Sequence, residues 1–174
     1  IYSKREEVLA DKDFIGHIKN IIAEFADDLF EGIKEMSEVP EIIKRFRETL
    51  YYTPDAHIDV TQPKTLPDLK QAILDNIYGE MDDKASKVGV ENFNMFARME
   101  YLRLIDIKWQ EHRENLDALR EAVNLRAYGQ KNPLLEYKLE GFDIFDKMID
   151  DIRKVIVRKV INVKVERYSE QPQR

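Results

Sequence analysis

The chain has 174 residues, which is enough for one domain or for two small helical subdomains that share a core. It contains no cysteine, which excludes disulfides, thiolate zinc sites and cysteine nucleophiles. Charged residues make up 36% of the chain, with only six glycines and six prolines, and this composition favours long solvated helices over a β-sandwich.

No apolar run approaches the ~20 residues of a membrane span and no signal peptide opens the chain, so we expect a soluble, cytoplasmic protein. Because the sequence begins at Ile1 within an apparent helix and without methionine, we also expect it to be a piece of a longer protein.

Charge is distributed unevenly along the chain. Residues 1–91 carry 12 basic and 20 acidic side chains, whereas residues 92–174 carry 16 basic and 14 acidic ones. We therefore do not expect the first part to bind nucleic acid or acidic lipid. The second part is too weakly basic for a dedicated nucleic-acid surface, so we expect no nucleic-acid partner.

Apolar spacing predicts four helices in the first 91 residues. In chain order, the first helix covers residues 1–10 and the second runs from residue 14 to a point between residues 32 and 36. The third begins at Pro40 and the fourth at Pro67. Residues 51–67 lack a regular pattern, although residues 57–60 could be briefly extended.

The most informative stretch is residues 101–148, where two helical patterns flank a short polar turn. We expect one helix from about Glu91 to Arg126, on the order of 50 Å long, and a return helix from Pro133 to about Lys159. Gly129 can adopt positive φ, Asn132 can cap the return helix, and Pro133 suits its first position. The fold class is therefore all-α, with a long antiparallel two-helix hairpin.

The two helices have apolar residues at alternating steps of three and four, which predicts a seam between them. The predicted seam consists of Leu102, Ile105, Trp109, His112, Leu116, Leu119, Val123, Phe142, Phe145, Ile149, Ile152 and Ile156. After it, the run Val160-Ile161-Asn162-Val163-Lys164-Val165 is rich in β-branched residues with a period of two, which predicts a short strand or an extended exit.

The hairpin also contains many fixed residues at fixed spacing. They are Asp106-x-x-Trp109-x-x-His112, Leu119-Arg120, Leu125-Arg126-x-Tyr128-x-Gln130-Lys131-x-Pro133 and Glu136-Tyr137-Lys138-x-Glu140-x-Phe142-x-x-Phe145. This set resembles the two-helix finger of SecA, the bacterial motor family that drives preproteins through the SecYEG channel. Ile1-Tyr2-Ser3-x-Arg5 resembles the end of that family's long scaffold helix. The resemblance implies the scaffold helix end at 1–13, a helical wing at 14–91, the finger at 92–160 and an extended exit at 161–174.

In the SecA family the tip of the finger enters the channel mouth, and its tyrosine contacts the moving polypeptide. The resemblance therefore implies that Tyr128 contacts preprotein, with Arg126, Gln130 and Lys131 as flanking groups that meet the channel or the substrate. It also implies that the finger docks on the motor and damps its ATP hydrolysis, at the cytoplasmic face of the inner membrane. From the residues alone, an ordinary hydrophilic loop with Tyr128 folded back is the alternative.

No catalytic or cofactor site is expected in this segment. There is no Gly-x-x-x-x-Gly-Lys-Ser/Thr run to cradle phosphate, and the resemblance implies nucleotide-binding domains elsewhere in the same polypeptide. His17 and His112 are isolated, and His57-x-Asp59 offers only two ligands, so we expect no metal site.

Trp109 is best interpreted as a core anchor, and Asp106 as an acceptor for a partner outside this segment. The cations Arg153, Lys154, Arg158 and Lys159 are interpreted as a solvated face, with contact to acidic phospholipid or a neighbouring domain as the alternative. The rival function, of a different class, is a purely structural or oligomerising helical module; nucleic-acid binding by the return helix is a weaker third.

Overall fold

The computed structural model describes residues 2–126 and 132–166 and confirms the all-α fold class, with no strand among the described residues. Six α-helices and two short 3-10 turns make up the described chain. They are α1 (Tyr2–Ala10), α2 (Phe14–Phe30), η1 (Met36–Glu38), α3 (Val39–Leu50), η2 (Pro54–Ala56), α4 (Leu66–Val88), α5 (Val90–Arg126) and α6 (Pro133–Asn162).

The start of α6 confirms the predicted cap. The side chain of Asn132 accepts hydrogen bonds from the backbone N–H groups of Leu134 and Leu135, at 3.2 and 3.4 Å, and Pro133 occupies the first helical position. These bonds satisfy amides that have no carbonyl partner inside the helix. The local sequence therefore determines where the return helix begins.

One local prediction was wrong, and a second holds only in part. Residues 57–60 are not extended: they form turns after η2, where the Asp59 carboxylate accepts a hydrogen bond from the backbone N–H of Thr61 at 3.0 Å. For residues 160–165 the sequence predicted a short strand or an extended exit. No strand forms there, because α6 continues to Asn162, and the exit begins only at Val163, which has extended backbone angles. Val160 and Ile161 are buried in the core, and this packing outweighs their β-branched preference.

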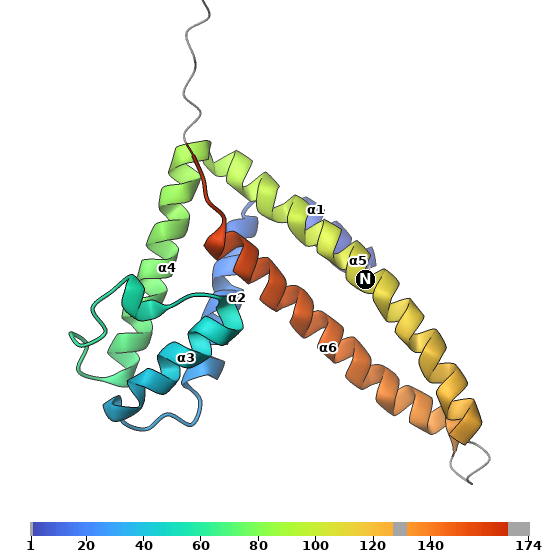
Figure 1. The fold of residues 1–174 in the computed structure, drawn as a ribbon. Coiled ribbons are helices and arrows are strands. Elements are labelled where there is room, and N and C mark those ends of the chain that lie inside the picture. Colours follow the sequence, from blue (N-terminus) through green and yellow to red (C-terminus); the bar gives the residue numbers. More distant parts are fainter. Residues whose placement is uncertain (1, 127–131, 167–174) are drawn as a thin grey trace, which may run out of the picture.

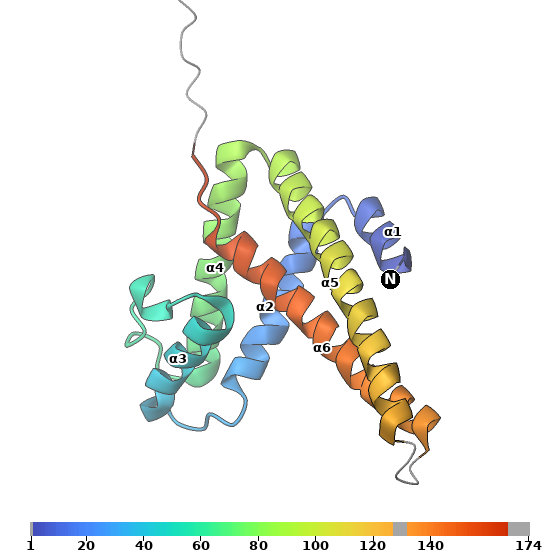
Figure 2. The ribbon, with the colours of Figure 1, turned by 45° about the vertical axis from the view of Figure 1, so that its right-hand side comes forward.

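We call the part of the chain from α2 to α4 the wing, and the pair of α5 and α6 the hairpin; the two parts meet in one core. Figure 1 and Figure 2 show α4 turning sharply into α5, and α5 and α6 converging at the end of the hairpin away from α3 and α4. Gly89 makes the turn with φ +94°, which a residue with a Cβ rarely adopts. One continuous cluster of buried side chains joins α2, α3 and α4 to the near parts of α5 and α6.

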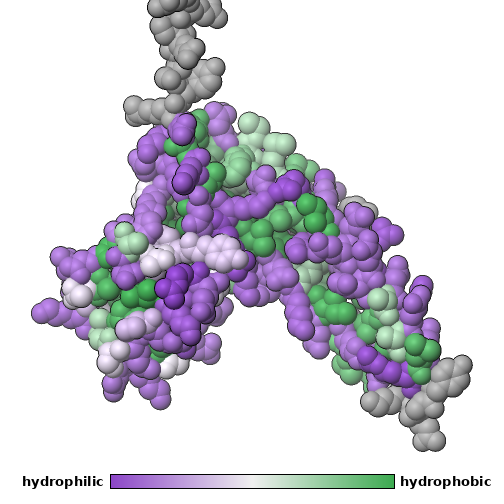
Figure 3. Space-filling model, viewed as in Figure 1, coloured by the Kyte–Doolittle hydropathy of each residue, from purple (hydrophilic) through white to green (hydrophobic). Residues whose placement is uncertain are grey.

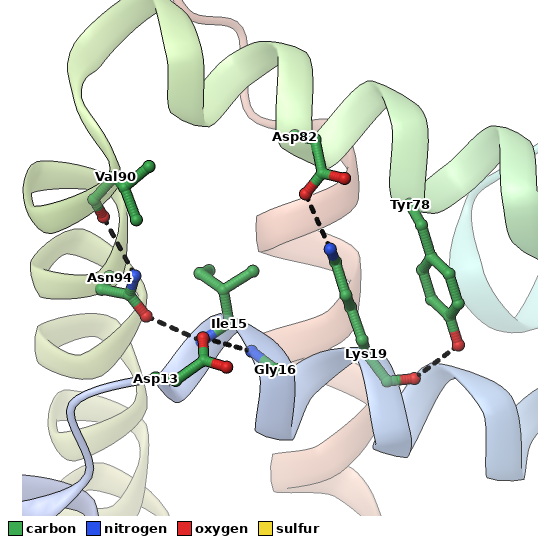
Figure 4. Close-up of polar contacts among 8 residues, drawn as sticks. All are labelled: Asp13, Ile15, Gly16, Lys19, Tyr78, Asp82, Val90 and Asn94. Carbon is green, nitrogen blue, oxygen red and sulfur yellow. Dashed lines mark hydrogen bonds and ion pairs between the residues drawn. The ribbon is translucent and has the colours of Figure 1, made fainter.

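Polar contacts fix α2 against the two helices that flank it, as Figure 4 shows. Buried Asn94 of α5 accepts a hydrogen bond from the backbone N–H of Ile15 at 2.8 Å and donates one to the carbonyl of Val90 at 3.0 Å. From α4, the Tyr78 hydroxyl donates to the backbone carbonyl of Lys19 at 2.8 Å. Asn94 thus satisfies one of the free amides at the start of α2.

The variant Asn94→Leu should lower the free energy of unfolding by about 1–3 kcal/mol, because it leaves the Ile15 N–H buried without an acceptor. Urea titration followed by circular dichroism measures this change. Asn20→Leu, on an exposed position of α2, is the matched control and should stay within about 0.5 kcal/mol of wild type. Equal effects of the two variants would show that the Asn94 bonds do not stabilise the junction.

Candidate functional site

The hairpin of α5 and α6 is the candidate site. Most of the predicted seam is withdrawn from solvent: Ile105, His112, Leu119, Val123, Ile152 and Ile156 are buried, and Leu102, Trp109, Leu116, Phe145 and Ile149 are partly buried. The indole of Trp109 packs against the core cluster at the near end of the hairpin. Met148, which the sequence analysis missed, is also buried; its spacing of three from Phe145 and four from Ile152 is the signal that would have found it.

Phe142 was predicted to lie on the seam, and this prediction was wrong, since 68% of its side chain is exposed. The adjacent residue, Gly141, faces α5 instead: a Cβ placed there would lie 3.6 Å from the Leu116 side chain. Because successive helical residues are rotated by about 100°, Phe142 must point away from that contact. It belongs to a different face of α6.

His112 occupies the middle of the seam, with only 4% of its surface exposed. Its ring lies 5.3 Å from that of Trp109 and 5.7 Å from that of Phe145, and its Nδ1 atom is buried with no hydrogen-bond partner among the described residues. Burial lowers the pKa of His112. This histidine is therefore a neutral packing residue of the hairpin, and the described residues contain no cluster of three or more His, Cys, Asp or Glu that could hold a metal ion.

At the far end of the hairpin, Arg126 closes the pair of helices. Its guanidinium forms an ion pair with Glu140 and lies 3.7 Å from the carboxylate of Glu136, both on α6. In the structure Arg126 thus contacts its own hairpin, and its predicted contact with channel or substrate stays a prediction. Tyr128, Gln130 and Lys131 lie outside the described residues, so their predicted roles also stay predictions.

Near the wing, ion pairs connect the hairpin to the rest of the chain. Asp106 pairs with Arg5 of α1, so the expectation of a partner outside this segment was wrong. Glu100 of α5 accepts from Lys159 of α6 at 2.8 Å and from Arg103 at 3.0 Å. The hydrogen bonds from Lys159 and then Arg103 lower the pKa of the Glu100 carboxyl.

The four basic residues in the second half of α6, Arg153, Lys154, Arg158 and Lys159, are engaged within the protein. Arg153 pairs with Glu24 of α2, Lys154 with Asp150, and Lys159 with Glu100. Arg158 donates to the backbone carbonyl of Thr49 at 2.7 Å and lies 4.1 Å from the Tyr51 ring. These contacts weaken the alternative in which the four cations form a free face for acidic phospholipid.

The polar group around His57 belongs to the wing. Its Nδ1 atom lies 2.5 Å from Glu80, and its ring stacks on Tyr52 at 4.3 Å. Tyr52 accepts a hydrogen bond from Asn76 at 2.6 Å, and its burial raises the pKa of the hydroxyl to about 12. These contacts fasten the irregular loop to α4.

None of the helices in the described part of the chain is both long and apolar enough to cross a bilayer.

The stability of the hairpin should depend on pH through His112. Its pKa is lower in the folded than in the unfolded chain, so the unfolded state takes up the proton first as the pH falls below ~6.5. The free energy of unfolding should therefore be greater at pH 8 than at pH 5.5, and His112→Phe should reduce that difference. Urea titrations at both pH values measure it, with His17→Phe, an exposed position, as control. An unchanged pH dependence in His112→Phe would contradict this account.

Comparison with known proteins assigns this chain to a family. A protein-family model described as the SecA wing and scaffold domain matches residues 1–164. The chain is 42% identical to the protein translocase subunit SecA of Treponema denticola, over 95% of this chain and 19% of that protein. The subunits of Borreliella burgdorferi and Picosynechococcus are 36% and 31% identical, over 97% and 99% of this chain and 19% of each relative. The chain thus spans about a fifth of the length of these relatives, and it belongs to the SecA wing and scaffold domain family.

Proposed function

We propose that this chain is the wing and two-helix finger of a SecA-type motor for post-translational protein export. In this proposal the finger contacts preproteins and the SecYEG channel, at the cytoplasmic face of the inner membrane. It couples them to ATP hydrolysis carried out by nucleotide-binding domains elsewhere in the same polypeptide. The segment itself performs no bond-making chemistry.

The observation that carries the proposal is the overhang of the hairpin. The core cluster shared with the wing includes Ile105 and Trp109 of α5 and begins at Phe145 on α6. Residues 110–126 therefore extend beyond the core cluster shared with the wing, over roughly 25 Å at ~1.5 Å per residue. A projection of this kind can carry its tip into the mouth of another protein.

The anchoring of the hairpin supports transmission of force. Both long helices begin or end within the wing core, and the ion pairs of Asp106, Glu100 and Arg153 join them to α1, to each other and to α2. A movement of the body should therefore be passed to the tip as a movement of one unit. At the tip, the ion pair of Arg126 with Glu140 holds the last turn of α5 to α6. It thereby fixes the two helix ends that flank Tyr128 in the sequence.

The described residues around the tip are also suited to an unfolded substrate. Large apolar side chains are exposed on both helices there, including Leu125, Leu134 and Leu135. Apolar and aromatic side chains can contact many different sequences without requiring one hydrogen-bonding partner. A motor that handles many preproteins needs this tolerance.

A photo-cross-linker at position 128 of the full-length protein should capture a preprotein stalled in the channel, because the proposal puts this side chain against the moving chain. Tyr128→Ala should lower the translocation rate several-fold, whereas Tyr128→Phe should retain most of it. Gel analysis of cross-linked products and protease protection of translocated preprotein measure the two effects.

The control cross-linker is at Met99, an exposed residue of α5 near the wing, and should capture no preprotein. Capture of neither preprotein nor channel from position 128 would contradict the proposed role of the finger. Capture of preprotein from both position 128 and position 99 would show that the cross-linker does not report proximity to the tip.

A further inference from the structure

A small pocket lies where α1 meets the start of α2 and the first half of α5. Figure 2 shows α1 beside α5, and the two helices are in contact. The pocket has a volume of about 170 Å³. Its lining consists of Glu7, Val8, Asp11, Phe14, His17 and Tyr101. Drug-sized ligands occupy roughly 300–1,000 Å³, so this pocket can hold only one small group, such as the end of a single side chain.

Two carboxylates form one side of the pocket. The backbone N–H of Asp11 donates to the carbonyl of Glu7 at 3.0 Å, so Asp11 follows Glu7 by one helical turn and both side chains lie on the same face. Neither carboxylate forms an ion pair with the side chains that the structure describes, and that of Asp11 accepts a hydrogen bond from the backbone N–H of Asp13 at 2.9 Å. The guanidinium of Arg98 donates to the Asp11 backbone carbonyl at 2.6 Å and pairs with neither acid. The pocket therefore offers free carboxylate oxygens to a positively charged donor.

Acidic side chains alone would not indicate a ligand, because hydrophilic residues cover much of the surface, as Figure 3 shows for one face of the molecule. The second observation is Tyr101, which lines the same pocket with only 6% of its surface exposed. Its hydroxyl has no hydrogen-bond partner in the described part of the chain, although buried tyrosine hydroxyls usually find one. Burial raises the pKa of this hydroxyl, Arg153 lowers it, and the Glu7 carboxylate raises it. The unpartnered hydroxyl therefore lies near the acidic side of the pocket.

The remaining walls are mainly aromatic. The ring of Phe14 lies 5.3 Å from that of Tyr101 and 5.9 Å from the imidazole of His17. Phe14 is fully buried, whereas His17 is exposed. Aromatic faces attract cations, and arginine makes this contact more often than lysine. A planar guanidinium can stack on a ring while its N–H groups donate to carboxylates, so this combination of walls favours arginine.

We propose that this pocket binds the guanidinium group of an arginine side chain from another polypeptide segment. The guanidinium would donate to the carboxylates of Glu7 and Asp11 and to the oxygen of Tyr101, with the aromatic rings beside its plane. A metal ion fits less well, since the described residues contain no group of three His, Cys, Asp or Glu side chains that could hold one. The pocket does not involve the tip of the hairpin, so it can be tested independently of the proposed function.

Titration with N-acetylarginine amide, followed by NMR of the aromatic side chains, tests the proposal. The signals of Tyr101 and Phe14 should shift in a saturable way. N-acetylcitrulline amide has the same shape without the charge and should bind about tenfold more weakly, as should N-acetyllysine amide, which has no planar group to stack. Glu7→Gln and Tyr101→Phe should each weaken binding of the arginine probe by roughly three- to tenfold, because each change weakens or removes an acceptor.

Glu6→Gln is the matched control, because Glu6 is an exposed acid of α1 that does not line the pocket. It should leave the affinity unchanged, and circular dichroism should show equal helix content in all variants. The absence of saturable shifts, equal binding of the citrulline or lysine probe, or equal loss in Glu6→Gln would overturn the proposal.

The same titration of the full-length protein identifies the source of the arginine. Binding that is retained there would assign the arginine to a separate polypeptide. Binding that is lost there would assign it to another part of the same polypeptide, which already fills the pocket.

Discussion

The burial of the last turns of α6 is the interaction on which both parts of the molecule depend. Ile152, Ile156 and Val160 lie in the same core as the wing helices, and truncating a buried isoleucine to alanine typically costs 2–5 kcal/mol. The hairpin is therefore not an independent unit tethered by a linker. Its return helix is part of the core of the wing.

This shared core explains how a narrow hairpin can project from a small body. Among the described residues, none of α5 beyond Trp109 belongs to the core cluster, and there the two helices are held by the seam and by Arg126. The seam is apolar and contains a neutral histidine, so few of its contacts require a fixed hydrogen-bond geometry between the two helices. Rigidity therefore comes from continuous helices that are fixed at one end, rather than from polar contacts along the arm.

Much of this architecture could be predicted from the sequence, because it depends on patterns among residues that are close together in the chain. The hairpin follows from apolar spacing, and the start of α6 follows from Asn132 and Pro133. The sequence analysis failed at Phe142 because α6 has two apolar faces, and steps of three and four can pass from one face to the other. It failed at Val160 because core packing decided between helix and strand.

The candidate site could be predicted less completely, since its contacts join residues that are distant in the sequence. No local pattern pairs Asp106 with Arg5, or Arg153 with Glu24. The predicted contacts of Tyr128, Gln130 and Lys131 depend on the family resemblance and lie outside the described residues. The structure adds how the tip is supported: α5 and α6 pair along the hairpin, and their ends near the wing are buried in the shared core.

The most direct test of this account is the distance between the arm and the wing in solution. Spin labels at exposed Arg120 of α5 and exposed Lys44 of α3, measured by double electron–electron resonance, report how firmly the shared core holds the arm. The account predicts a single narrow distance distribution, equal in width to that between Arg120 and exposed Lys138 across the hairpin. A broad or bimodal arm–wing distribution, beside a narrow one within the hairpin, would contradict it.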